Sequence, residues 1–266
     1  MSNVWFNKEQ NAINARIHTS NMANRYGEQI NHSIMLSKTY SPDSVIIPNY
    51  IQDTVLNVEI MDTDSVSAAK RFADSNMNVC ILNFASYKHP GGMFINGSMA
   101  QEECICHASD LYNILTAFSN YYEWNKKNLN RSMYTNRAIY TPDVVFENFE
   151  DNGKDIKNIN FFSVLTCASP NLSPSLKYGN APKITKEENH TILESRIKFV
   201  LDIMSENKVD IPILGAFGCG VFKQDPHEVA RTFMNILQNN SYGFKKVIFA
   251  IPGGPNLAAF RKVIGK

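Results

Sequence analysis

Apolar residues recur along this chain at two spacings, and the alternation between them predicts strands separated by helices. Compact apolar runs rich in β-branched and aromatic residues predict buried strands. Such runs cover residues 79–84, 160–167, 211–214 and 246–251, and residues 55–61 form a further strand of modest alternation.

Apolar positions three or four residues apart predict helices between these strands. The N-terminal segment, residues 7–37, contains no Pro and predicts one or two helices. Caps mark two helix starts, at Asp64 and at Asp225 followed by Pro226. Strands separated by helices favour an α/β fold whose sheet is covered on both faces. Further helical patterns cover residues 111–118, 193–204 and 257–263.

The region from residue 121 to 160 is the least patterned part of the chain and is interpreted as insertions on the core. Within it, residues 138–140 and 144–146 predict two short paired strands around the turn Thr141-Pro142-Asp143. The sequence contains no internal repeat and no low-complexity tract, so we expect one large domain or a domain with an extension.

Composition narrows the classes of function. An apolar share of 44% in 266 residues is enough for a core, and a formal net charge of +1 gives no overall basic field for nucleic-acid binding. No apolar run approaches the roughly 18 residues of a membrane-spanning helix, and the N-terminus lacks the pattern of a secretory signal. Five cysteines, an odd count, fit reduced intracellular thiols better than disulfides.

A first glycine loop, residues 85–100, follows the predicted strand 79–84 and ends on Gln101-Glu102-Glu103, just before a helical pattern. Gly91 and Gly92 allow the backbone to approach a ligand closely, and the carboxyl groups can move protons. The alternative is an ordinary surface loop in which Glu102 and Glu103 only favour the positive end of a helix.

A second glycine loop, residues 215–222, follows the predicted strand 211–214 and precedes the helix start at Asp225. Gly215, Gly218 and Gly220 place backbone amides near a helix N-terminus, which suits a diphosphate. The spacing fits neither the P-loop nor the Rossmann fingerprint. A tight turn between strand and helix remains the alternative.

Other candidates are weaker. Cys104-Ile105-Cys106-His107 lacks the usual spacing of zinc ligands, so these cysteines are better interpreted as core thiols. Cys219 has no His placed by the sequence to activate it as a nucleophile. Three phenylalanines are more typical of a core than of base stacking, although one of them could line an adenine pocket: Phe217, Phe222 and Phe260.

Several ordered blocks carry a resemblance to a known family. Gly91-Gly92 with the closing Gln101-Glu102-Glu103 resembles the signature of microbial-type poly(ADP-ribose) glycohydrolases, a Gly-Gly-Gly stretch followed after a short spacer by Gln-Glu-Glu. The resemblance spans about residues 1–264. Further matching blocks are residues 82–86, 109–112, 140–144, 168–171 and 215–222, the last followed by Asp225-Pro226.

The resemblance implies a three-layer α/β/α, macrodomain-like mixed sheet with an N-terminal helical extension. The expected division is residues 1–45 for the extension and 46–266 for the ADP-ribose-binding catalytic domain. The implied reaction is hydrolysis of ribose–ribose O-glycosidic bonds, with ADP-ribose released and neither metal nor cofactor needed. The implied partner is ADP-ribose or poly(ADP-ribose) on modified proteins, without a membrane or a required nucleic acid. The expected location is intracellular, cytoplasmic or, in a eukaryote, nuclear.

The resemblance also implies residue roles. Glu103 is expected to be the catalytic acid and base, and Glu102 to hold the ribose next to the scissile bond. The residues expected to bind substrate are Gln101, Gly91, Gly92 and Asn96 in the first glycine loop and Gly218, Cys219, Gly220, Val221 and Phe222 in the second.

Two physical points qualify these roles. Adjacent residues do not face each other on a helix or strand, so Glu102 and Glu103 are not expected to form the opposed carboxyl pair of most glycosidases. Met93 stands where the family has its third glycine, so it either clashes, if positive φ or close approach of a ligand is required there, or points outward. Two alternatives therefore stay open: an ADP-ribose-binding module without turnover, and a hydrolase of single ADP-ribose groups on protein or nucleic acid.

Overall fold

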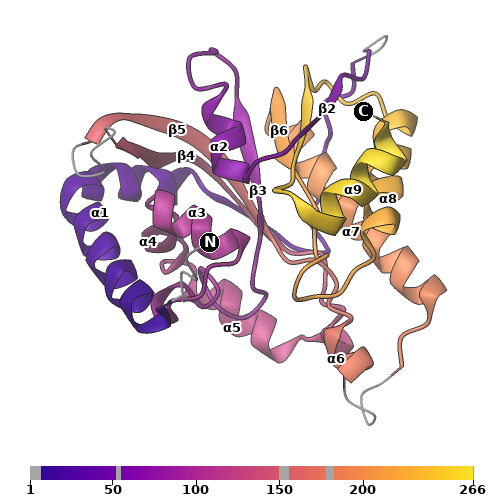
Figure 1. The fold of residues 1–266 in the computed structure, drawn as a ribbon, viewed down its shortest axis with the longest axis horizontal. Helices are drawn as coiled ribbons and strands as arrows, with labels where there is room; N and C mark the ends of the chain where they lie inside the picture. Colours follow the sequence, from indigo (N-terminus) through magenta and orange to yellow (C-terminus); the bar gives the residue numbers. More distant parts are fainter. Residues whose placement is uncertain (1–6, 52–54, 150–155, 178–182, 266) are drawn as a thin grey trace.

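A mixed sheet of seven strands runs through the protein, with helices on both faces (Figure 1). The computed structural model describes residues 7–51, 55–149, 156–177 and 183–265. The strand order is β1-β4-β5-β3-β6-β7-β2. Neighbouring strands from β5 to β2 are parallel, whereas β4 is antiparallel to both of its neighbours. The predicted three-layer α/β/α architecture is confirmed.

The central strands form where the sequence has short, fully apolar runs. β3 and β6 match the predicted strands 79–84 and 211–214. Every residue of β6 is buried, and so is every residue of β3 except the last. The other predicted strands differ at their ends: β2 and β7 are shorter than predicted, and β5 begins before residue 160. The bounds are β1 Lys38–Tyr40, β2 Val58–Met61, β3 Val79–Phe84, β4 Ala138–Phe149, β5 Ile156–Cys167, β6 Ile211–Leu214 and β7 Val247–Ala250.

The interpretation of residues 121–160 as insertions was wrong for its second half, because residues 138–149 and 156–160 are strands of the sheet. Residues 138–140 and 144–146 do not pair with each other: both lie in β4 and pair with β5. A bulge between Thr141 and Val144 accommodates Pro142, and Asp143 has φ +55° there. A bulge tolerates proline within a strand, which is why the sequence looked like a turn.

The helices form two outer layers. α1 to α5 bury apolar side chains against one face of the sheet, and α7, α8 and α9 cover the other, as the left and right sides of Figure 1 show. The bounds are α1 Lys8–Leu36, α2 Ser65–Lys70, α3 Gln101–Ala108, α4 Leu111–Leu115, α5 Ser119–Lys127, α6 Ser173–Lys177, α7 Lys186–Glu206, α8 Pro226–Asn239 and α9 Gly254–Ile264, with 3-10 turns η1 Phe94–Asn96 and η2 Asn130–Ser132.

Both predicted helix caps are confirmed. The Asp64 carboxylate accepts the Ser67 N–H at the start of α2. The Asp225 carboxylate accepts the N–H groups of His227 and Glu228, with Pro226 as the first helical residue of α8. The Asp225 cap and Pro226 fix the start of α8 shortly after the second glycine loop.

The N-terminal segment forms one long helix, α1, with a kink at Tyr26. Its first turn packs against Gly97 of the first glycine loop, whose φ of +79° and lack of a side chain permit the approach. Arg25 pairs with the buried Glu147 of β4 at 2.8 Å. The chain then adds β1 to the edge of the sheet, so the predicted extension contributes a strand; the boundary at residue 45 itself stays a prediction.

Candidate active site

The two glycine loops lie side by side at the carboxyl ends of two central strands. The first follows β3 and the second follows β6, and these strands are parallel neighbours. The Phe84 and Phe217 rings, one from each side, lie with centroids 5.6 Å apart. Ligands of open α/β sheets bind beyond the carboxyl ends of the strands, so the surface formed by the two loops is the candidate site.

Glu102 and Glu103 lie within the first turn of α3, not in a loop before it. Their exposed fractions are only 3% and 6%. Glu102 Oε2 accepts the Ser86 N–H at 2.6 Å, and its Oε1 accepts the Asn83 side-chain amide at 3.3 Å. Glu103 Oε1 accepts the Met93 N–H at 2.9 Å. Loop backbone therefore fixes both carboxyl groups.

The two carboxyl groups converge beside Gly92. A Cβ atom on Gly92 would lie 2.6 Å from Glu103 Oε1 and 2.9 Å from Glu102 Oε2, and this glycine has φ +61°. We expected adjacent glutamates to point to different sides; the loop folds back over the first turn of α3, so both side chains reach it. Gly92 leaves the space that they occupy.

Burial dominates the electrostatics of Glu102. Burial and, to a smaller extent, the Glu103 charge raise the pKa of Glu102, hydrogen bonds from Ser86 and Asn83 lower it, and the net value is about 8. Within the described ranges, neither glutamate forms an ion pair with Lys, Arg or His. Glu102 is therefore mostly protonated at neutral pH.

Gln101 ties α3 to β3. Its Oε1 accepts the Phe84 N–H at 2.8 Å, and its Nε2 donates to the Leu82 carbonyl at 2.9 Å and to Ser65 Oγ at 3.1 Å. These contacts hold the glutamates at the end of the strand. Asn96 lies in η1, is exposed, and contacts Met93 Sδ at 3.8 Å.

Met93 fits its position without strain. Its φ is −110°, which any residue adopts, and its side chain is 44% exposed. The outward orientation is therefore the one that the structure has, and the clash is absent. The backbone at this position still supplies the N–H that Glu103 accepts.

The second glycine loop presents open backbone donors. In the described part of the chain, the N–H groups of Gly218, Gly220, Val221 and Phe222 have no hydrogen-bond acceptor. Gly218 has φ +79°, and a Cβ there would collide with Ser169. Val221 is 69% exposed. Consecutive free amides form an anion-binding concavity.

Two tyrosines that the sequence did not single out, Tyr87 and Tyr134, join the two loops. Tyr87 stacks on Tyr134 with centroids 4.2 Å apart, and Phe222 lies edge-on to Tyr134 at 6.0 Å. The segment leading to Tyr134 has positive φ at Asn130, Arg131 and Ser132 as well as at Tyr134 itself. Such strain clusters at functional sites, but it leaves no mark in composition or periodicity.

Cys106 and two of the three phenylalanines lie in the core, whereas Cys104 and Cys219 are half-buried. Cys106, Phe217 and Phe260 are fully buried. Burial raises the pKa of Cys219 to about 12, which disfavours the nucleophilic thiolate. Among the described residues, no cluster of three or more His, Cys, Asp or Glu could hold a metal ion, and no helix is both long and apolar enough to cross a membrane.

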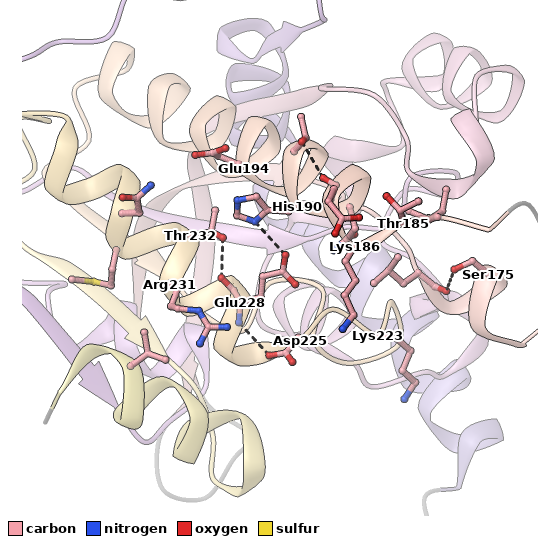
Figure 2. Close-up of a pocket in the computed structure, with 18 of the residues that line it drawn as sticks. Ser175, Thr185, Lys186, His190, Glu194, Lys223, Asp225, Glu228, Arg231 and Thr232 are labelled. Carbon is pink, nitrogen blue, oxygen red and sulfur yellow. Dashed lines mark hydrogen bonds and ion pairs between the residues drawn. The ribbon is translucent and has the colours of Figure 1, made fainter.

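A groove of about 1220 Å³ lies elsewhere, between α7, α8 and α9. Figure 2 shows His190 of α7 and Glu228 of α8 joined across it. Its described lining includes Lys223 and Asp225, directly after the second glycine loop, but no residue of either loop. Acidic and basic side chains are mixed along it, so it lacks the convergent chemistry of the glycine loops.

Comparison with known proteins agrees with this geometry. The family model for the catalytic domain of microbial-type PARG matches residues 9–148, just over half of the chain. No curated protein matches the chain in sequence.

Solved structures of poly(ADP-ribose) glycohydrolases are similar over nearly the whole chain. The enzyme from Thermomonospora curvata bound to the inhibitor ADP-HPD has a TM-score of 0.81 and 26% identity, covering 96% of this chain and 99% of that one. The enzyme from Deinococcus radiodurans in complex with ADP-ribose has a TM-score of 0.76 and 28% identity, covering 89% and 97%.

Proposed function

Because the chain belongs to the family of microbial-type PARG catalytic domains, we infer that it is a poly(ADP-ribose) glycohydrolase. It is a glycosidase that hydrolyses the ribose–ribose O-glycosidic bond of poly(ADP-ribose) and releases ADP-ribose. The observation that carries this conclusion is the convergence of the Glu102 and Glu103 carboxyl groups beside Gly92, next to a loop of open amides. The carboxyl groups supply a proton donor, and the open amides suit a diphosphate.

Glu103 is the acid and base in this proposal. Its carboxyl group protonates the oxygen of the leaving ribose while the bond from that oxygen to the anomeric carbon breaks. The oxocarbenium-like carbon then takes the oxygen of a water molecule, and the water proton returns to Glu103. The Met93 N–H at 2.9 Å supports the proposal, because it holds the carboxyl group in one orientation.

Glu102 has a different role in the proposal, holding the ribose next to the scissile bond. Its raised pKa supports this role, since a neutral carboxyl group offers an O–H donor to a ribose hydroxyl. The ribose is bordered in this proposal by Gly91, Gly92 and Asn96. Gln101 positions the two glutamates by fixing α3 to β3.

The second glycine loop binds the diphosphate in this proposal. The open N–H groups of Gly218, Gly220, Val221 and Phe222 support this role, with Cys219 between them. The Phe222 side chain, which packs against Tyr134, borders the distal ribose. The five unpaired thiols favour action inside the cell, on ADP-ribose polymers of modified proteins.

The alternative of binding without turnover rested on Met93. Its φ of −110° and exposed side chain mean that no positive φ is required at this position, which weakens this alternative. Hydrolysis of a single ADP-ribose group would use the same pocket with another leaving group. Parallel assays on polymer and on mono-modified protein separate these activities.

The deciding experiment is release of ADP-ribose from poly(ADP-ribose) by the wild type and by Glu103→Gln. The variant is expected to lose roughly 10²–10⁴-fold in kcat, the usual contribution of general acid–base catalysis, while calorimetry still detects ADP-ribose binding. Glu28→Gln, at an exposed position of α1, is the control and should keep full activity. Undiminished release by Glu103→Gln would sink the assignment.

A further inference from the structure

Helix α5 lies directly against the first glycine loop. The Asn125 side-chain amide donates to the Tyr87 carbonyl at 2.8 Å, and the Tyr87 hydroxyl donates to the Asn128 carbonyl at 3.2 Å. Tyr87 follows Ser86, whose N–H holds Glu102. The end of α5 is therefore beside the candidate catalytic carboxyl groups, and Figure 1 shows α5 at the lower edge of the view below α3.

Basic side chains gather where these two segments meet. Lys88 and His89 come from the loop, and Lys126 and Lys127 from the last turn of α5; all four are exposed. Burial together with the charges of Lys126 and Lys88 lowers the pKa of His89, so these groups are close enough to interact. Lys126 pairs with Glu123 at 2.8 Å, whereas Lys88 and Lys127 have no carboxylate partner among the described residues.

Arg137 extends this cluster. Its guanidinium lies over the rings of Trp124 and Tyr121, at 4.2 Å and 4.8 Å from their centroids, and makes no ion pair in the described structure. Its Nε is buried without a hydrogen-bond partner. Trp124 is 37% exposed beside it. We call Lys88, His89, Lys126, Lys127, Arg137 and Trp124 the basic patch.

Strand order places the basic patch opposite the second glycine loop. β3 has β6, with that loop, on one side and β5 and then β4 on the other. Arg137 directly precedes β4, where Ala138 pairs with the last residue of β5, Cys167. In the proposed function, the ADP-ribose unit that is released has its diphosphate on the second glycine loop and its distal ribose at Glu103. The remainder of the polymer would then lie toward β5 and α5.

We propose that the basic patch binds the poly(ADP-ribose) chain beyond the scissile bond, through its phosphates and adenine rings. The proposal rests on the proposed function, since it concerns the same substrate. Each unit of this chain carries a diphosphate and an adenine, which lysines and an exposed indole recognise as they do in single-stranded nucleic acids. Among the described residues, only one of the patch's lysines and its arginine forms an ion pair, Lys126 with Glu123.

The test is the double variant Lys88→Gln/Lys127→Gln, assayed on long polymer. KM is expected to rise about fivefold to tenfold at low salt, and the slope of log(kcat/KM) against log[salt] to fall by about 1.4, or roughly 0.7 per lost phosphate contact. The substitutions should change KM and leave kcat unchanged. The calorimetric Kd for free ADP-ribose should also stay unchanged, because one terminal unit does not reach the patch.

The matched control is Lys186→Gln/Lys262→Gln, two exposed lysines on α7 and α9 without described carboxylate partners. An equal rise of KM in this control would overturn the proposal, because the loss of overall charge would then explain the effect. No rise of KM in the test variant would overturn it too, because the patch would then not contact the polymer. Single-stranded RNA that binds more tightly than the polymer, and loses more affinity than the polymer through the patch substitutions, would also overturn it, since the patch would then be a nucleic-acid site.

Failure of the proposed function is separable from failure of this inference. Binding of intact polymer is measured by fluorescence anisotropy in the Glu103→Gln background, with and without the patch substitutions. A wild type that does not cleave polymer refutes the glycohydrolase assignment alone. Patch substitutions that leave anisotropy-measured polymer affinity unchanged refute the basic patch alone.

Discussion

The two glycine loops are built in opposite ways. In the first, backbone donors are already taken: Ser86 and Met93 donate to Glu102 and Glu103, and both carboxyl groups are buried. In the second, the N–H donors of Gly218, Gly220, Val221 and Phe222 are open among the described residues, and Val221 is largely exposed to solvent. One loop has its polar groups satisfied internally, and the other leaves them for a ligand.

This difference matches two separate demands. Proton transfer needs a carboxyl group held in one geometry before the substrate arrives, because a small misplacement costs much of the rate. Binding an anion needs donors without competing acceptors. We therefore expect substitutions in the first loop to act mainly on kcat, and substitutions in the second to act mainly on ADP-ribose affinity.

Among the glycine substitutions, the largest effect is expected from Gly92→Ala. The added methyl group would lie within 3 Å of both glutamates on backbone with φ +61°, so the carboxyl groups must move. A displacement of this size lowers kcat by about 100-fold. The measurement is ADP-ribose release at saturating polymer, with circular dichroism to check the fold.

Gly220→Ala is the control in the other loop. A Cβ at Gly220 has no neighbour within 4 Å, and its φ is not positive, so the fold and kcat should be retained. Equal losses of kcat in the two variants would contradict the comparison, because glycine content rather than glutamate placement would then control activity.

Gly218→Ala should lower affinity. Its φ of +79° disfavours a side chain, and the methyl group would displace Ser169 or the loop. Losing the alignment of one or two amide donors to a charged diphosphate weakens binding about tenfold or more. Calorimetry with ADP-ribose measures it. A drop in kcat at saturating substrate with unchanged Kd would assign this glycine to the chemistry instead.

Much of this arrangement could be predicted from local sequence. Apolar runs located β3 and β6, the caps at Asp64 and Asp225 located helix starts, and the position of both glycine loops after strands was correct. These features depend on residues close together in the chain. Burial of a short run and satisfaction of a helix N-terminus are local requirements.

What the sequence could not supply depends on distant segments. β4 looked irregular because its bulge contains Pro142, and only pairing with β5 makes it a strand. The convergence of Glu102 and Glu103 requires the loop to fold back over α3, which residue spacing alone argued against. Tyr134 became relevant only through its stacking on Tyr87, 47 positions earlier in a different element.

A smaller effect should appear in the pH dependence of stability. Glu102 ionises near 4.5 when unfolded, but burial raises its pKa to about 8 in the folded protein. The folded state therefore binds the extra proton, and its stability falls as the pH rises from about 4.5 to 8. Glu102→Gln should remove this loss, on the order of 3 kcal/mol, in urea unfolding at pH 5.5 and 8.5. Asp110, whose pKa burial raises to about 7, is present in both proteins and cancels. Parallel pH profiles would mean that Glu102 is not the buried acid.

The smallest effect is expected from Met93→Gly, which restores the family's third glycine. The φ of −110° requires no glycine, the side chain is 44% exposed, and the N–H donated to Glu103 comes from the backbone, which both residues have. We expect kcat within about twofold of wild type and a loss of about 0.5–1 kcal/mol in the free energy of unfolding, because glycine gains freedom in the unfolded chain. Polymer-release kinetics and urea unfolding measure both. A large gain in kcat would show that Met93 restricts the first glycine loop, and that this loop is less well prepared for proton transfer than its hydrogen bonds indicate.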